Sequence, residues 1–118
     1  MRIEDLERVD KEHMYKTYDS WPDIARESYE NKFEKFDVKD IDHVVFAGMG
    51  GSGSIGDAIS AILSKKDIHV SIVKGYTLPR TVDSKTVIIA TSVSGNTNET
   101  LEILKIAKKT SAKIIGFS

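Results

Sequence analysis

The sequence predicts a doubly wound α/β fold with a parallel sheet, preceded by a helical arm. Four short β-branched runs after residue 41 alternate with glycine-rich turns and helical stretches, which is the order of successive strand–helix–strand units. These runs are apolar on both faces rather than alternating, as expected of strands buried inside a parallel sheet. The pattern therefore favours a sheet that is covered on both faces.

The first forty residues contain no glycine and form the expected arm. Apolar residues recur there at near-helical spacing and predict one amphipathic helix through Ile3, Leu6, Val9, Met14 and Tyr18. A second helix is predicted to begin near residues 19–20, with Pro22 in its first turn, and to run through Ile24, Tyr29 and Phe33. We therefore expect a helical arm over 1–40 and an α/β domain over 41–118.

The α/β domain is predicted to contain four strands and two helices. The strands are expected within residues 42–48, 68–73, 86–92 and 112–118. The helices are expected over 54–65 and 96–110, and residues 75–84 are expected to form a loop. The sequence stops directly after the fourth strand, where a doubly wound fold continues into a covering helix, so we interpret it as truncated.

Composition excludes several classes of protein. Lys and Arg number 17 against 18 Asp and Glu, so no basic field is available for nucleic acid. No apolar run approaches the roughly 20 residues that cross a bilayer, and the charged N-terminus does not resemble a signal peptide. Cysteine is absent, which excludes disulfides, thiolate nucleophiles and cysteine-bound metals. We expect a cytoplasmic protein that binds neither nucleic acid nor a membrane.

Five glycines occur in GMGGSGSIGD, residues 48–57, directly after the first predicted strand. Such a turn brings backbone N–H groups and a helix N-terminus to one point, where a phosphate binds. The spacing G-x-G-x-x-G from Gly48 also fits a dinucleotide fingerprint, but the expected acidic residue about 20 positions later is absent. Lys74 stands there instead and would suit the 2′-phosphate of NADP. A Walker A loop is excluded because Ser-Ile follows Gly53 where Lys and Ser or Thr are required.

A second turn, TSVSGNTNET over residues 91–100, follows another predicted buried strand and opens a helix. Hydroxyl groups replace glycine here and provide donors without fixed charge, from Ser92, Ser94 and Thr97. Because neighbouring parallel strands end at the same edge of a sheet, both turns are expected to enclose one anion. Asn96 and Glu99 have the spacing of a capping box, so they are assigned to helix initiation.

The remaining polar residues have structural interpretations. Asp57 is expected in a first helical turn, where it complements the helix dipole. Arg80 is expected to be a solvated loop residue. The three histidines have no regular ligand spacing, so no metal site is predicted from His13, His43 and His69.

The two turns together resemble the sugar isomerase (SIS) domain, whose string S-x-S-G-N-T-x-E-T is present over 92–100. With GMGGSG upstream, the sequence is most similar to the archaeal-type bifunctional phosphoglucose/phosphomannose isomerases. The resemblance implies a flavodoxin-like sheet, a partial SIS domain over 41–118, a sugar-phosphate ligand and no cofactor. It assigns the grip on the phosphate to Ser92, Ser94 and Thr97, and the first turn of the substrate site to Gly50, Gly51 and Ser52.

The resemblance also implies that the catalytic groups lie beyond residue 118. Aldose–ketose isomerisation needs a base to move a proton between C1 and C2, a cation beside the enediolate and an acid–base group for ring opening. In the family these are a glutamate, an arginine and a histidine from the partner subunit, with a lysine near the C-terminus. None of their motifs occurs in this sequence. We therefore expect the 118 residues alone to be inactive.

The function that follows is the phosphosugar-binding part of a homodimeric isomerase. The full-length protein is expected to interconvert glucose 6-phosphate, and mannose 6-phosphate, with fructose 6-phosphate. Two alternatives remain open: a phosphosugar-sensing SIS domain of a regulator, and an NADP-binding oxidoreductase domain. A regulator would carry a basic recognition helix ahead of the domain, whereas the arm is rich in acidic residues.

Overall fold

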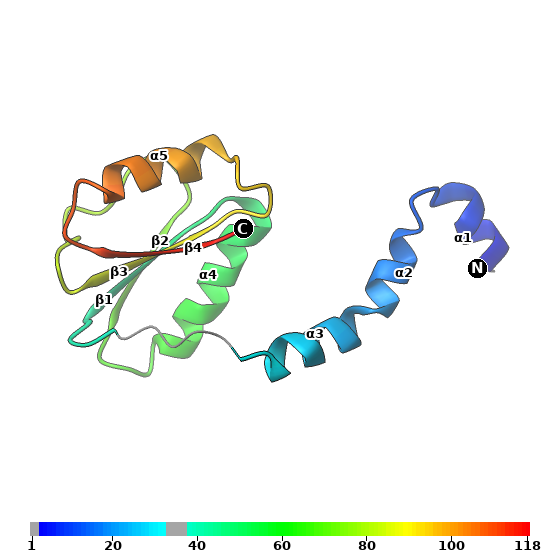
Figure 1. The fold of residues 1–118 in the computed structure, drawn as a ribbon, viewed down its shortest axis with the longest axis horizontal. Coiled ribbons are helices and arrows are strands. Elements are labelled where there is room, and N and C mark those ends of the chain that lie inside the picture. Colours follow the sequence, from blue (N-terminus) through cyan, green and yellow to red (C-terminus); the bar gives the residue numbers. More distant parts are fainter. Residues whose placement is uncertain (1–2, 33–37) are drawn as a thin grey trace. The chain divides into compact units, whose positions relative to one another are not determined.

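The computed structural model describes residues 3–32 and 38–118. The chain divides into two compact units, Met1–Asp37 and Val38–Ser118, and each is described by itself. Among the described residues, the first unit contains three short helices, and the second contains a four-stranded sheet with two helices (Figure 1).

The N-terminal unit consists of α1 (Ile3–Val9), α2 (Met14–Asp19) and α3 (Trp21–Glu30). The prediction of one continuous helix through Tyr18 was wrong, because the chain turns between α1 and α2. There the Asp10 carboxylate accepts the N–H of Tyr15 at 3.0 Å, and His13 adopts the left-handed region with φ 53°. Backbone N–H groups of Tyr15 and Met14 hold the pKa of Asp10 below its usual value.

Helix α3 begins close to the predicted position and carries Pro22 in its first turn. Its aromatic and aliphatic residues are solvent-exposed within the structure, at 57% for Trp21, 50% for Ile24 and 91% for Tyr29. Phe33, which the sequence placed on the same helix, lies outside the described residues.

The second unit contains a parallel sheet in the order β2-β1-β3-β4 (Figure 1). The strands are β1 (His43–Ala47), β2 (His69–Val73), β3 (Thr86–Thr91) and β4 (Lys113–Phe117). Each lies inside its predicted range. The two central strands, β1 and β3, are largely buried, as predicted. The prediction of burial was wrong for β2 and β4, which lie at the edges of the sheet and contain no fully buried residue. The order with β1 beside both β2 and β3 is that of a flavodoxin-like fold, so the predicted fold class is confirmed.

Helices α4 (Gly50–Leu63) and α5 (Asn98–Ala107) cover opposite faces of this sheet. Alternate residues of a strand point to opposite faces. Val45 accordingly packs with Ala107 of α5 in the core, whereas the next residue, Phe46, lies against Gly56 of α4. Both helices differ from prediction at their ends: α4 begins four residues earlier than expected, and α5 is shorter at both ends.

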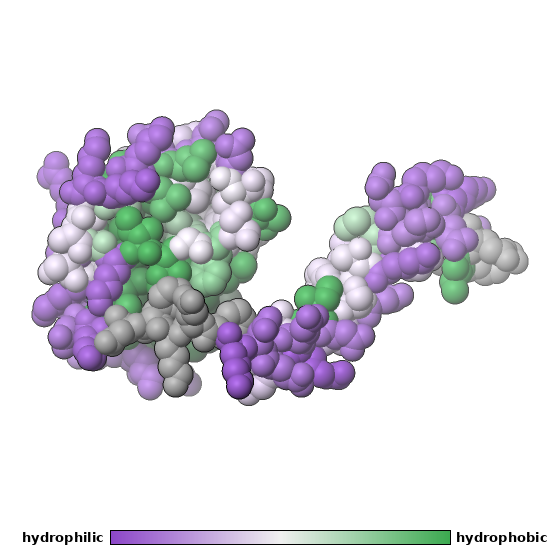
Figure 2. Space-filling model, in the orientation of Figure 1, coloured by the Kyte–Doolittle hydropathy of each residue, from purple (hydrophilic) through white to green (hydrophobic). Residues whose placement is uncertain are grey.

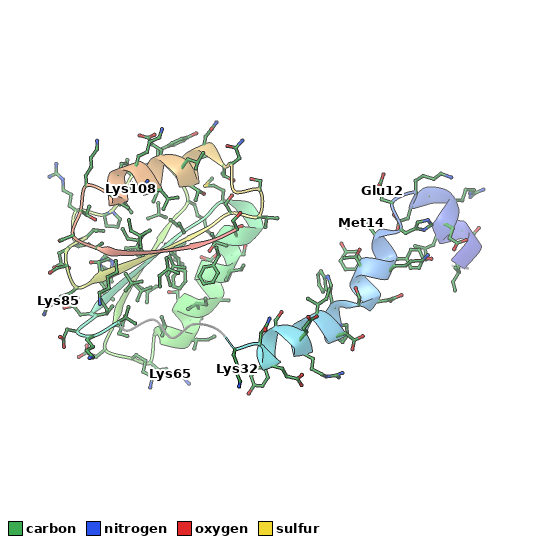
Figure 3. All side chains as sticks on the ribbon, viewed as in Figure 1. Glu12, Met14, Lys32, Lys65, Lys85 and Lys108 are labelled. Atoms are coloured by element: carbon green, nitrogen blue, oxygen red, sulfur yellow. The ribbon has the colours of Figure 1, made fainter. Side chains whose placement is uncertain are left out.

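The charged side chains labelled on this unit, Lys65, Lys85 and Lys108, lie at its periphery (Figure 3). An apolar region is visible on the sheet between α5 and α4 (Figure 2). It includes a groove of about 490 Å³ with almost entirely apolar walls, formed by Val44, Phe46, Ile55, Ile59, Leu63, Ile89, Thr91 and Phe117. Within the described ranges, no helix combines the length and apolar character that spanning a bilayer demands.

Candidate functional site

The glycine turn (residues 48–53) and the hydroxyl turn (residues 92–97) emerge from adjacent strands at one edge of the sheet. Strands β1 and β3 are parallel neighbours, with Ala47 paired to Ala90. The chain leaves both strands in the same direction and enters α4 and α5 from the two turns. The sheet therefore places the two turns side by side, as parallel pairing of their strands requires.

Glycine allows the first turn to lie directly against the end of β3. A Cβ added to Gly48 would approach the carbonyl oxygen of Thr91 and the carbonyl carbon of Ser52, each at 3.1 Å. Gly50 has φ 54°, in the left-handed region that favours glycine. The backbone at Met49 is extended and α4 begins at Gly50, with no side chain capping the N–H groups of its first turn.

The hydroxyl turn gathers three side-chain oxygens. Ser92 Oγ lies 2.9 Å from Thr97 Oγ1, and Ser94 Oγ lies 3.4 Å from each of the other two. Gly95, with φ 63°, turns the chain between Ser94 and Thr97. Ser92 is 7% exposed, whereas Ser94 is solvent-exposed and Thr97 half-buried. The hydroxyls thus form one cluster, with Ser92 at its buried side.

Both turns line a single open cavity of about 430 Å³. Four of the residues that the sequence proposed for the site are on its wall: Gly51, Ser52, Ser94 and Thr97. Gly50 and Ser92 are absent from the wall, although the Ser92 hydroxyl contacts two residues of the cluster. Sequence reasoning missed the three apolar wall residues, Met49, Ile55 and Val93. They have no polar side chain that could bind a phosphate, so the sequence reasoning, which looked for donors, did not propose them.

Helix α5 does not start with the predicted capping box. Its N-cap is Thr97 rather than Asn96, and no side chain caps the helix. The Thr97 hydroxyl is engaged by the serine hydroxyls, while the Asn96 N–H donates to Ser94 Oγ at 3.3 Å. Glu99 instead accepts a hydrogen bond from Tyr76 of the loop after β2, and its negative charge raises the pKa of that phenol. The turn is organised around its hydroxyls, which leaves the first N–H groups of α5 without a side-chain cap.

Asp57 was also placed incorrectly by the sequence, because α4 begins earlier than predicted and Asp57 lies beyond its first turn. Its carboxylate accepts a hydrogen bond from Lys74 Nζ at 2.7 Å, and the Lys74 stem passes over Gly53. Neither residue lines the cavity, and Arg80 is an exposed loop residue, as expected. An anion in the cavity would therefore be bound by neutral hydroxyl and N–H donors, which hold anions at helix N-termini.

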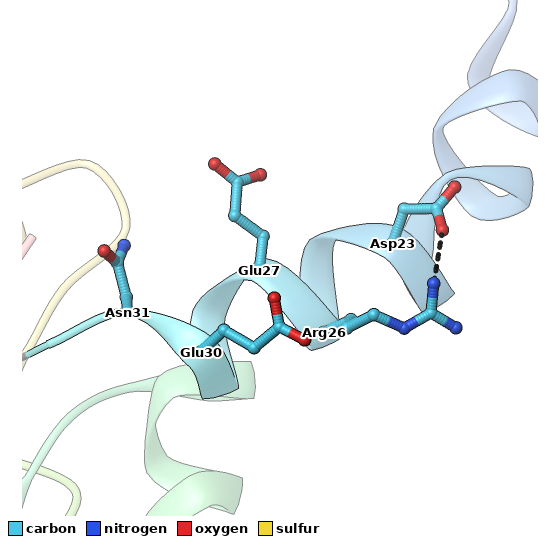
Figure 4. A pocket seen from close by; sticks show the side chains of 5 residues that line it. All are labelled: Asp23, Arg26, Glu27, Glu30 and Asn31. Carbon is cyan, nitrogen blue, oxygen red and sulfur yellow. Dashed lines mark hydrogen bonds and ion pairs between the residues drawn. The ribbon is translucent and has the colours of Figure 1, made fainter.

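Other parts of the structure are less suited to anions. A hollow of about 400 Å³ on α3 is lined by Asp23, Glu27, Glu30, Asn31 and Arg26, and the Arg26 guanidinium lies 3.5 Å from Asp23 (Figure 4). Three carboxylates against one paired guanidinium would repel a phosphate. In residues 3–32 and 38–118, no cluster of three or more His, Cys, Asp or Glu side chains has the geometry to hold a metal ion.

Comparison with known proteins gives a consistent family. The model of the SIS domain matches residues 38–118. The chain is 39% identical over 109 residues to a bifunctional phosphoglucose/phosphomannose isomerase of Caldicellulosiruptor bescii, covering 89% of this chain and 32% of that protein. It is 43% identical over 84 residues to a protein of the same name from Thermoplasma volcanium, covering 70% and 27%. A D-glucosamine-6-phosphate 4-epimerase of Sulfolobus acidocaldarius is 33% identical over 104 residues, covering 86% and 31%.

The fold has a solved counterpart as well. A putative phosphosugar isomerase from Salmonella typhimurium superposes with a TM-score of 0.57 over 74% of this chain and 32% of that chain, at 21% identity, which shows the fold alone. The present chain thus spans about a third or less of these relatives. Because the SIS domain model matches residues 38–118 and the alignment to the Caldicellulosiruptor bescii protein covers 89% of the chain, we conclude that the chain belongs to the SIS domain family.

Proposed function

We propose that this chain is the phosphosugar-binding part of an aldose–ketose isomerase, which interconverts glucose 6-phosphate, and mannose 6-phosphate, with fructose 6-phosphate. The single observation that supports this best is the cavity shared by the glycine turn and the hydroxyl turn. The relatives named phosphoglucose/phosphomannose isomerases support the reaction. We propose further that the full-length protein is a cytoplasmic homodimer, as the resemblance implies.

In this proposal the phosphate group lies against Ser94 and Thr97, with the first N–H groups of α5 behind it. The three hydroxyls contact one another in the ligand-free chain. Each hydroxyl has one proton, which would turn from its neighbour to a phosphate oxygen when the anion arrives. Ser92 would join through a rotation of its hydroxyl, and Ser52 with the Gly50–Gly51 backbone would approach the sugar from the other turn.

The chain's own residues would bind and orient the substrate, and the chemical step would depend on groups outside residues 1–118. The described wall of the cavity offers no carboxylate or imidazole to move a proton between C1 and C2. Binding without catalysis is therefore the expected behaviour of this chain. An assay of residues 1–118 with fructose 6-phosphate tests this, and turnover that is lost in a Ser94→Ala variant would overturn it.

Binding itself is tested by calorimetric titration with fructose 6-phosphate, glucose 6-phosphate and inorganic phosphate. A hydrogen bond to a charged group contributes about 1.5–3 kcal/mol, so Ser94→Ala or Thr97→Ala should weaken binding by roughly 10- to 100-fold. Ser111→Ala, an exposed hydroxyl just beyond the opposite end of α5, is the matched control and should bind as the wild type does. Undiminished binding by both site variants would refute the assigned site.

A relative whose name gives another activity suggests a second class of ligand for the calorimetric titration. The Sulfolobus protein is named a D-glucosamine-6-phosphate 4-epimerase and aligns over 86% of this chain, so glucosamine 6-phosphate belongs in the same titration. The NADP alternative has less support, because the Lys74 ammonium that a 2′-phosphate would require already pairs with Asp57 at 2.7 Å. Binding of NADP(H) that persists in Ser94→Ala would favour that alternative.

A further inference from the structure

Two histidines stack on each other at the amino edge of the sheet, the edge opposite the candidate site. His43 and His69 are the first residues of β1 and β2 and are paired in register. Their ring centroids lie 4.5 Å apart, with 12° between the ring planes. His43 is 4% exposed, whereas His69 is solvent-exposed. The stack therefore joins the edge strand β2 to a buried residue of a central strand.

Hydrogen bonds fix the proton on the buried ring. Thr86 Oγ1 accepts the N–H of Asp83 at 3.0 Å and donates its only proton to Asp83 Oδ1 at 3.2 Å. It must then accept from His43 Nδ1, which lies 3.4 Å away, so the neutral ring carries its proton on Nδ1. His43 Nε2 is left as an acceptor for the Ser71 hydroxyl at 2.9 Å. Both ring nitrogens are satisfied in the neutral state.

Adding a second proton to His43 is opposed by its surroundings. Burial lowers the pKa of His43 most, and the positive charge that His69 can carry lowers it further. The backbone of Thr81 and the carboxylates of Asp83 and Asp42 act in the opposite direction. Asp42 is itself paired with Lys85 at 3.5 Å. The neutral ring is therefore the form that the folded sheet selects.

We propose that the His43–His69 stack, with the Ser71 and Thr86 hydroxyls, is a pH-sensitive latch that holds the edge strand β2 on the sheet and loosens in acid. Two imidazolium rings repel each other at 4.5 Å, and protonated His43 has no bulk water around it. In the part of the chain that the structure describes, β1 is the only strand that pairs with β2, so the other edge of β2 has no strand beside it. Acid would release the amino ends of β1 and β2 before the rest of the sheet opens.

Nuclear magnetic resonance and hydrogen exchange on the whole 118-residue chain test the latch. The His43 ring should titrate below the pKa of about 6.5 that an unperturbed histidine has. On acidification below the His43 midpoint, amides of His69–Val73 should exchange about tenfold faster per pH unit than intrinsic chemistry accounts for, because one pKa unit is a factor of ten. The exchange rates of the β3 amides should show no such acceleration.

Two variants shift the latch in opposite directions. His69→Phe keeps a stacked ring without charge and should raise the His43 midpoint, while Asp83→Asn removes a nearby negative charge and should lower it. His13→Asn is the matched control, since asparagine also tolerates the left-handed backbone at that position, and it should leave the midpoint unchanged. The proposal is overturned if the pKa of His43 is not below about 6.5, or if acid speeds hydrogen exchange equally in β2 and β3.

Discussion

The close approach of the glycine turn to the end of β3 depends on Gly48, and replacing this residue with alanine tests that dependence. The added Cβ would lie 3.1 Å from the Thr91 carbonyl oxygen, 3.1 Å from the Ser52 carbonyl carbon and 3.2 Å from Ser52 Cβ. Carbon atoms in proteins pack best at about 3.5–4.0 Å, and two of these neighbours are backbone atoms that cannot rotate away. The end of β3 or the first turn of α4 must therefore shift by a few tenths of an ångström.

The size of the effect follows from the cost of overpacking, which is about 1–3 kcal/mol. We expect the free energy of unfolding of Gly48→Ala to fall by about that amount in urea titrations. If the turn moves to relieve the strain, affinity for fructose 6-phosphate falls by up to about 100-fold, because 1.4 kcal/mol corresponds to tenfold. Calorimetry of the same samples measures this second effect.

Alanine variants of two further glycines distinguish a loss of ligand affinity from a loss of folding stability. A Cβ at Gly56 would lie 2.9 Å from Phe46 Cβ, under α4 and off the cavity wall. Gly56→Ala should therefore lose stability yet keep its affinity, with part of the loss offset by up to about 1 kcal/mol of helix propensity. Gly75→Ala meets nothing within 4 Å and should change neither quantity. Wild-type affinity in Gly48→Ala, or an equal loss of affinity in Gly56→Ala, would refute the reasoning.

Four further outcomes are expected. Gly53→Ala brings a Cβ within 2.7 Å of the Gly48 carbonyl oxygen, so urea unfolding should show a loss of about 2–3 kcal/mol, and a smaller loss would mean that the turn is pliable. Lys74→Met keeps the stem over Gly53 and breaks a pair whose side chains are 44% and 52% exposed, so stability should change by less than about 1 kcal/mol. Glu99→Gln should lower the pKa of Tyr76, seen as a difference in ultraviolet titration from the wild type; identical curves would contradict the contact. Because the pKa of His43 is lowered on folding, the unfolded chain binds more protons near about pH 6, so the free energy of unfolding should fall as pH drops from about 7 to 5, and a flat profile in that window would contradict the cited shift.

The strands and the two turns were predictable because their signals are local. A short, mostly apolar run marks a strand, and all four observed strands lie within such runs. Burial did not follow from these runs alone, because β2 and β4 lie at the edges of the sheet. A turn that approaches a neighbouring backbone needs glycine, and Gly48 and Gly50 meet that need for different reasons, a close contact and a positive φ. The helix ends were less predictable, since Thr97 uses its hydroxyl within the cluster rather than as a cap.

The sequence by itself determined the class of fold, the order of strands and helices, and which hydroxyls and glycines follow β1 and β3, because each of these depends on residues close together in the chain. Only the tertiary structure decided which of those residues face one cavity, that Ser92 lies at the buried side of the cluster, and that Asp57 pairs with Lys74. It also brought His43 onto His69, which are separated by a helix in the sequence. These contacts arise from the pairing of strands and the angle of helices on the sheet, which no local pattern of residues specifies.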